Sequence, residues 1–168
     1  MTQLQEHLEK INACQEACEW AGKRTPQEAW DQCKRADWLL WWAWTVRRDS
    51  RPPLIRATCC GPRRALRFVP AGELRPLRAI EAAEAVAEND TPELRAAAGV
   101  AARGDWAARG ARAARAAAYA ARVASEVTED ASSCAARAAR AAAYAAAGHV
   151  AICSEIRAIL QCPFGGAK

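Results

Sequence analysis

Apolar residues recur every three or four positions along most of this chain, the spacing that lines one face of an α-helix. The first series follows Thr2 and Gln5, which form a capping box that satisfies amides of a first helical turn, and it predicts a helix over about residues 2–22. Its apolar positions are Leu4, Leu8, Ile11, Cys14 and Cys18. No run of alternating β-branched residues is present in the sequence, so the pattern predicts an all-α fold.

Start signals predict two more helices in the tryptophan-rich part of the chain. Thr25 followed by Pro26 is a typical helix start, and Asp37 is the expected cap of the helix after it. That helix, over about residues 38–47, is apolar all the way round. A helix without a polar face is typical of the buried centre of a fold, so we expect this one to be the central helix.

Prolines shape the middle of the chain. Residues 51–53 (Arg-Pro-Pro) are expected to break it, and a helix over about 54–68 follows. Gly61 and Pro62 lie inside that helix and should kink or divide it, because proline lacks the amide hydrogen that the helix needs. A further helix is expected from about Pro76 to Glu88.

An internal repeat dominates the last third. Residues 111–121 and 136–146 have the same sequence, ARAARAAAYAA, and a short polar segment separates them. Alanine is the best helix former, so we expect two long helices, over about 92–127 and 131–160, with a possible break at Gly104–Asp105. Two such helices joined by a short link predict a long alanine-rich antiparallel helical hairpin.

These elements together predict a single helical domain, a multi-helix bundle that ends in the hairpin. Its first part, 1–90, holds the large core side chains; 91–161 is the alanine-rich hairpin; 162–168 is a non-helical tail. Six of the seven tryptophans lie between positions 20 and 44. They could form the core or line a ligand pocket or interface. We expect Trp38, Trp41 and Trp42 in the core, and partial exposure at Trp20 or Trp30.

The repeat places arginines and a tyrosine on one face of each helix. The first copy carries Arg112, Arg115, Tyr119 and Arg122, and the second carries Arg137, Arg140 and Tyr144. Two interpretations stay open. The stripes form a partner-binding surface, since guanidinium groups bind carboxylates and phosphates through paired hydrogen bonds. Alternatively they are solvated faces in which arginines rest on the tyrosine rings.

Charge narrows the class of partner. The formal net charge is +5, and inhibitors of nucleic-acid-cleaving toxins are usually acidic to match a basic groove. The partner expected here is therefore acidic, or neutral with an apolar contact. The polar N-terminus does not resemble a signal peptide, and no apolar run in the sequence reaches the ~18–20 residues of a membrane span. We expect a cytoplasmic protein with reduced thiols at its eight cysteines.

Candidate metal and catalytic sites are weak. Cys14 with Cys18, and His149 with Cys153, are two pairs at i, i+4 that could together hold zinc if their helices met. Buried structural cysteines are the expected alternative. The sequence holds only two histidines and none of the common catalytic motifs, so we expect neither an enzyme nor a cofactor.

The tryptophan-rich segment also carries a resemblance. Residues 13–21, with Ala13-Cys14 and Glu19-Trp20-Ala21, and residues 28–41, with Glu28-Ala29-Trp30 and Cys33 through Trp41, are similar to a family of all-helical bacterial and phage proteins classed as immunity proteins. Residues 75–85 and the two repeats resemble that family's middle and C-terminal segments. The resemblance implies a protein that neutralises a toxin, and it implies no catalytic or target-binding residue.

Sequence and resemblance together predict a non-enzymatic protein-binding inhibitor of a bacterial toxin or defence effector, of the immunity or phage anti-defence type. A small-ligand or nucleotide-binding protein that uses arginine, tyrosine and tryptophan is the alternative. A nucleic-acid-binding protein that uses the arginine stripes is the third class. Homo-oligomers stay open.

Overall fold

The computed structural model describes residues 2–47, 50–106, 112–125, 131–144 and 148–163, and within them every regular element is helical. The expected all-α fold is confirmed. The elements are α1 (Gln3–Lys10), α2 (Gln15–Ala21), α3 (Pro26–Gln32), α4 (Ala36–Val46), α5 (Arg51–Ala65), η1 (Leu66–Phe68), α6 (Arg75–Glu88), α7 (Pro92–Trp106), α8 (Arg112–Ser125), α9 (Ala131–Ala142) and α10 (Gly148–Ile159).

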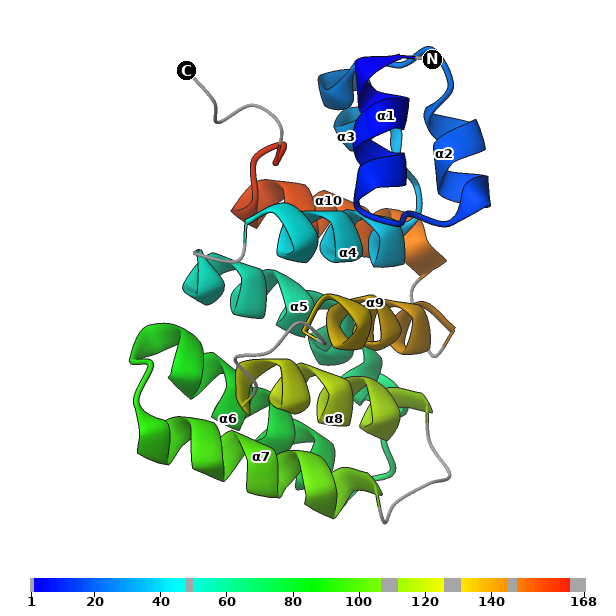
Figure 1. Cartoon of the computed structure of the whole chain (residues 1–168). Coiled ribbons are helices and arrows are strands. Elements are labelled where there is room, and N and C mark those ends of the chain that lie inside the picture. The colour runs from blue at the N-terminus through cyan, green and yellow to red at the C-terminus, as the bar shows by residue number, and fades with distance from the viewer. Residues whose placement is uncertain (1, 48–49, 107–111, 126–130, 145–147, 164–168) are drawn as a thin grey trace.

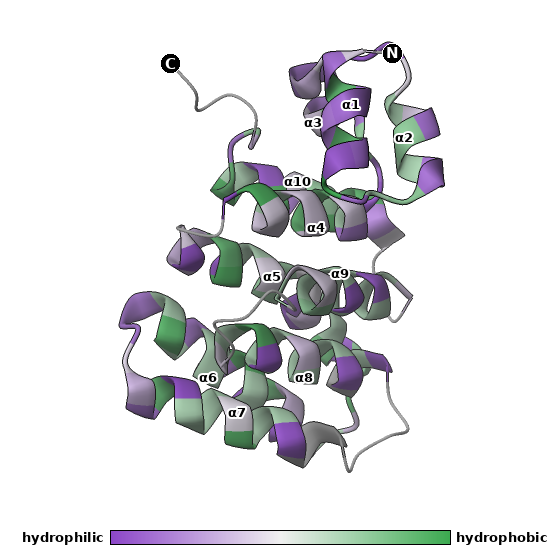
Figure 2. Cartoon of the chain, viewed as in Figure 1, coloured by the Kyte–Doolittle hydropathy of each residue, from purple (hydrophilic) through white to green (hydrophobic). Residues whose placement is uncertain are grey.

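The helices form a stack (Figure 1). The short helices α1, α2 and α3 lie at one end, followed by α4 with α10, α5 with α9, and α6 with α8, and α7 closes the other end. Figure 2 shows green and purple bands alternating along α6, α7 and α8, as expected of amphipathic helices. None of the helices in the described ranges is long and apolar enough to span a membrane.

The N-terminal helix is shorter than expected. The capping box of Thr2 and Gln5 is present, and Thr25 with Glu28 forms a second one at α3. The single helix expected over 2–22 is wrong, because Asn12 has a left-handed backbone with φ of 58° that separates α1 from α2. Asparagine adopts that conformation more easily than most residues, since its short side chain bonds locally.

The central position belongs to α5 rather than to the helix at 38–47. Helix α5 contacts α4, α6, α8, α9 and α10. It begins at Arg51, so the Arg-Pro-Pro segment forms its first turn and the expected helix break at residues 51–53 is wrong. The helix also continues through Pro62, so the expected division there is wrong. Gly61 gives α9 room, because a Cβ there would lie 2.9 Å from the Cβ of Ala142.

Helix α4 is buried on most of its surface but not all round. Trp42, Trp44 and the leucines between Trp38 and Trp41 are buried, whereas Trp38 and Trp41 are half-buried. Asp37 lies inside the first turn of the helix and does not cap it; Arg35 occupies the cap position. Trp30, an expected site of partial exposure, is only 2% exposed, and Trp20 is half-buried.

The alanine-rich third holds four helices in place of the two long ones. Helix α7 continues past the expected break at Gly104–Asp105 to Trp106, and residues 107–111 lie outside the described ranges. Helices α9 and α10 are separate, and α10 starts at Gly148 with φ of 64°. The two repeats fall on α8 and α9, which pack against each other. In the tail, residues 162–163 are non-helical and the remainder is outside the described ranges.

Candidate functional site

The two repeats meet through reciprocal contacts between arginine and tyrosine. The Arg112 guanidinium lies 5.6 Å from the ring centre of Tyr144, and the Arg137 guanidinium lies 5.9 Å from that of Tyr119. Arg112 and Arg137 are the second residue of their repeats, and the tyrosines are the ninth. Each repeat therefore supplies the cation for the other's ring, an arrangement expected when two copies of one segment pack side by side in opposite directions.

Three arginines of this face form no ion pair with a carboxylate of the described residues. Arg112, Arg115 and Arg137 are exposed, and no carboxylate among the described residues pairs with them. Tyr144 beside them is 66% exposed. Arginines that pair with carboxylates are Arg35, Arg51, Arg63, Arg64, Arg75, Arg95 and Arg140. We call Arg112, Arg115, Arg137, Tyr119 and Tyr144 the repeat face.

The other two arginines expected on this surface are placed differently. Arg140 occupies the position in the second repeat that Arg115 has in the first, yet it turns to α4 and binds Asp37. Because α4 packs on α9, Arg140 of the second repeat meets Asp37, whereas Arg115 of the first repeat stays exposed. Arg122 is half-buried on α8. A partner-binding role for Arg140 therefore competes with its role inside the molecule.

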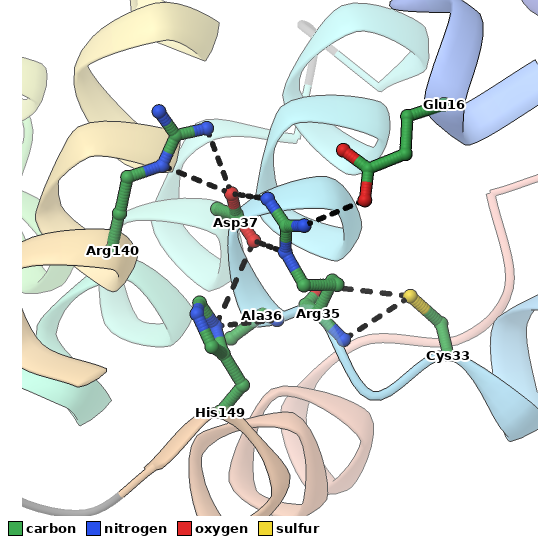
Figure 3. A network of polar contacts seen from close by, with 7 residues as sticks. All are labelled: Glu16, Cys33, Arg35, Ala36, Asp37, Arg140 and His149. Atoms are coloured by element: carbon green, nitrogen blue, oxygen red, sulfur yellow. Dashed lines mark hydrogen bonds and ion pairs between the residues drawn. The ribbon is translucent and has the colours of Figure 1, made fainter. Parts of the chain in front are cut away.

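Asp37 is the centre of a buried polar network (Figure 3). Its side chain is 1% exposed and accepts hydrogen bonds from Arg35 Nε (3.0 Å, to Oδ1) and Nη2 (2.9 Å, to Oδ2). Arg140 donates to Oδ2 from Nε at 3.2 Å and from Nη2 at 2.9 Å. Arg35 also reaches Glu16 at 3.3 Å. A carboxylate on an otherwise apolar helix is tolerated because two guanidinium groups pair with it.

His149 joins α10 to this network. Its Nδ1 atom accepts a hydrogen bond from the Ala36 amide at 3.3 Å and lies 3.7 Å from Asp37 Oδ1. An Nδ1 that accepts carries no proton, so His149 is neutral with its proton on Nε2. In a catalytic His–Asp pair, Nδ1 donates its proton to the carboxylate. The geometry is therefore that of a structural link among α4, α9 and α10.

Burial and charge act in opposite directions on the two groups. Burial alone would raise the pKa of Asp37, but the hydrogen bonds from Arg35 and Arg140 outweigh it and hold the pKa below its ordinary value. Burial lowers the pKa of His149, and the neighbouring Asp37 carboxylate offsets this only in part. At neutral pH the network is expected to hold an ionised Asp37 and a neutral His149.

Acidification should destabilise the fold through His149. Its pKa is below 6.5 when folded and returns to 6.5 on unfolding, so its contribution is complete above 6.5 and is lost as the pH falls below that value. We expect the free energy of unfolding, measured in urea, to decrease from about pH 7.5 to about pH 5.5. In His149→Asn an amide oxygen can still accept the Ala36 amide without titrating, so the decrease should be smaller. Burial also lowers the pKa of His7, so His7 adds to the pH dependence of both proteins. An equal decrease in the free energy of unfolding in the parent and in His149→Asn would contradict the assignment to His149.

A cavity of about 260 Å³ lies against this network. Its charged lining residues are Asp37 and Arg140, and its aromatic walls come from Trp20, Trp38, Trp41 and Trp42. The core role expected for the tryptophans is confirmed for Trp42, which is buried and also borders this cavity, whereas a ligand in the cavity stays a prediction. The indole N–H of Trp42 has no hydrogen-bond acceptor among the described residues.

No family model, curated protein or solved structure matches this chain. The resemblance to immunity proteins stays a prediction from the residues quoted for it.

The four residues considered for zinc do not come together. Cys14 is exposed and Cys18 is half-buried, while Cys153 lies on the buried side of α10. Burial raises the pKa of Cys153 to about 12, which disfavours the thiolate that a metal needs. The described residues contain no group of three or more possible metal ligands, and no disulfide joins the cysteines in these ranges.

The Asp37 network was missed by the sequence analysis. Arg35 and Asp37 are only two positions apart, a spacing without meaning on a helix face, and Arg140 is 103 positions away in sequence. One signal was available. Asp37 stands alone among tryptophans and leucines on its helix, and a carboxylate in such a place needs a cation.

Proposed function

We propose that this protein acts without catalysis, by binding an acidic surface of another protein through the repeat face. The observation that carries the proposal is the set of three exposed guanidinium groups without a carboxylate partner in the described ranges. Guanidinium groups bind carboxylates through paired hydrogen bonds, and tyrosine and arginine are enriched where interfaces concentrate their binding energy.

The contacts between arginine and tyrosine, which the solvated-face interpretation also predicts, order the side chains that would meet a partner. Arg112 lies over Tyr144 and Arg137 lies over Tyr119, so both guanidinium groups are held before a partner arrives. A side chain that is already ordered loses less entropy on binding. Alanines of α8 and α9 are buried between the helices, which provides a rigid support for the face.

We further propose that the partner is a bacterial toxin or defence effector, so that the protein acts as an inhibitor of the immunity or anti-defence type. This narrower class is supported by the resemblance of residues 13–21 and 28–41 to immunity proteins and by the basic net charge of +5, which favours an acidic target. The absence of enzymatic activity is supported by the neutral, backbone-bonded His149 and by the raised pKa of the buried cysteines.

Nucleotide binding has a weaker basis. A more polar groove beside Trp20 and Trp38 is lined by Arg24, Arg35 and Arg157, as a phosphate site would be. Each of these arginines is engaged within the chain. Arg24 bonds Gln32 and the Trp20 carbonyl, Arg35 pairs with Asp37, and Arg157 bonds the carbonyls of Trp30 and Cys33. A phosphate would have to displace these contacts.

Charge reversal on the repeat face tests the proposal. The variant Arg112→Glu/Arg115→Glu/Arg137→Glu should stay folded, because the positions are exposed and glutamate is a good helix former. It should retain its protein partner at least about tenfold less than the parent, since like charges across an interface repel. The measurement is co-purification from a nuclease-treated bacterial lysate, with a melting curve for each protein.

The matched control is Lys23→Glu/Arg78→Glu/Arg103→Glu, which has the same net charge and changes exposed positions outside the face. It should retain the partner as the parent does. Equal loss in both variants would reduce the effect to overall charge. Full retention by the folded repeat-face variant would leave the arginines with a solubilising role. Arg140 is left unchanged because a carboxylate there would face Asp37.

A further inference from the structure

The cavity beside α4 has the character of a binding site for a small molecule. It lies among α1, α2, α3, α4 and α9, with a volume of about 260 Å³. Asn12 and Cys14 of its lining are exposed, so it opens to solvent. An apolar cavity of about 150 Å³ holds benzene, so this one has room for about ten non-hydrogen atoms.

One hydrogen-bond donor of the lining, on Arg140, is open to a ligand, and another polar atom, the indole nitrogen of Trp42, is buried without an acceptor in the described ranges. Trp42 is 6% exposed, and its indole N–H has no acceptor in the described part of the chain. A buried donor left without an acceptor is costly, and such groups are rare in folded proteins. Arg140 uses Nε and one terminal nitrogen on Asp37, and Figure 3 shows its other terminal nitrogen directed away from that carboxylate. Its side chain is 54% exposed, so an anion can reach it.

The carboxylate of the same lining is already occupied, and cations lie close to it. Both oxygens of Asp37 accept hydrogen bonds from guanidinium groups. Arg24 lies 4.5 Å from the ring centre of Trp20, and Arg35 lies 4.5 Å from that of Trp38. These two guanidinium groups lie in the neighbouring polar groove, and together with Arg140 they disfavour a cationic ligand, to which Asp37 offers no unoccupied oxygen. The outward nitrogen of Arg140 favours a ligand that brings an acceptor.

We propose that this cavity binds a small carboxylic acid with an apolar or aromatic body of about ten non-hydrogen atoms. The body lies between the tryptophans of α4 and the leucines of α1. The carboxylate accepts a hydrogen bond from the outward nitrogen of Arg140, since charged pairs of this kind are the strong ones. The site shares no residue with the repeat face and goes beyond the protein-binding function.

Tryptophan fluorescence of the full chain tests the proposal with phenylacetate, which has ten non-hydrogen atoms. We expect saturable quenching with a dissociation constant of about 0.1–1 mM, in keeping with so small a ligand. The uncharged 2-phenylethanol should bind at least about fivefold more weakly and the cationic 2-phenylethylamine more weakly still. No saturation by about 10 mM phenylacetate, or tighter binding of the amine, would overturn the proposal.

A substitution that fills the cavity tests whether the ligand binds inside it. Ala136 lines it from α9 and is half-buried, so Ala136→Phe should fold and weaken phenylacetate binding at least about tenfold by occupying the volume. The matched control Ala97→Phe, on the exposed face of α7 at the other end of the stack, should bind as the parent does. Unchanged binding in Ala136→Phe would overturn the assignment to this cavity. Should Ala136→Phe fail to fold, Ala17→Leu fills the same cavity from α2. It should likewise weaken phenylacetate binding, and unchanged binding would overturn the assignment.

Discussion

Replacing Trp44 by alanine is expected to lower the free energy of unfolding by about 3–5 kcal/mol, as the loss of a large buried aromatic does. Trp44 is 3% exposed, and its indole N–H donates to Thr58 Oγ1 at 3.0 Å. That hydroxyl in turn donates to the Leu54 carbonyl at 2.8 Å. The substitution therefore opens a cavity between α4 and α5 and removes a buried hydrogen bond at once. Urea unfolding at equilibrium measures the change.

Trp41→Ala is the control for Trp44→Ala. Trp41 lies one helical turn away and is half-buried, so its removal should destabilise the protein by about half as much. A midpoint of urea unfolding for Trp44→Ala as high as that for Trp41→Ala would contradict the packing described for α4.

The second large effect is expected at Asp37. In Arg35→Met/Arg140→Met the carboxylate stays buried without a cation, and breaking a buried ion pair in this way costs about 3–5 kcal/mol. Removing the Asp37 carboxylate while both arginines stay should lower the free energy of unfolding by less. The arginine side chains are 32% and 54% exposed, so they can turn to water. Adding Asp37→Leu to the double variant should therefore recover more than half of the loss.

The pH dependence separates this cause from simple loss of packing. In the parent the arginines hold the pKa of Asp37 below its unfolded value, so the stability that it contributes is lost as the pH falls through that range. In the double variant both guanidinium groups are gone, and burial raises the pKa of Asp37. As the pH falls, the difference in the free energy of unfolding between the parent and the double variant should therefore become smaller. A triple variant with Asp37→Leu as unstable as the double one would contradict the network.

Local signals predicted much of the fold. The capping boxes at Thr2 and Thr25 start helices where the sequence places them, because a cap is a matter of residues three positions apart. The break at Asn12 was missed, since apolar residues continue at helical spacing across it and one left-handed residue leaves no periodic trace. Pro62 was overweighted as a helix breaker, because packing of α5 against five other helices outweighs the local cost of proline.

The candidate site could be predicted only in part. The repeats gave the residues of the repeat face, because helical periodicity tells which side chains share a surface. Periodicity does not tell what lies opposite, so Arg115 and Arg140 were equivalent in the sequence, while in the structure only Arg140 meets Asp37. The cavity beside Trp42 depends on how α1, α2 and α3 pack on α4, which no local pattern in the chain specifies.

Site-specific cross-linking tests the central proposal, binding through the repeat face, most directly. A photoreactive benzoylphenylalanine in place of Arg115 should form a covalent adduct with an acidic protein in a bacterial lysate. The same group in place of Arg78, an exposed arginine on α6, should form none. Adducts that form equally well from both positions, or an adduct with nucleic acid from position 115, would contradict the proposal.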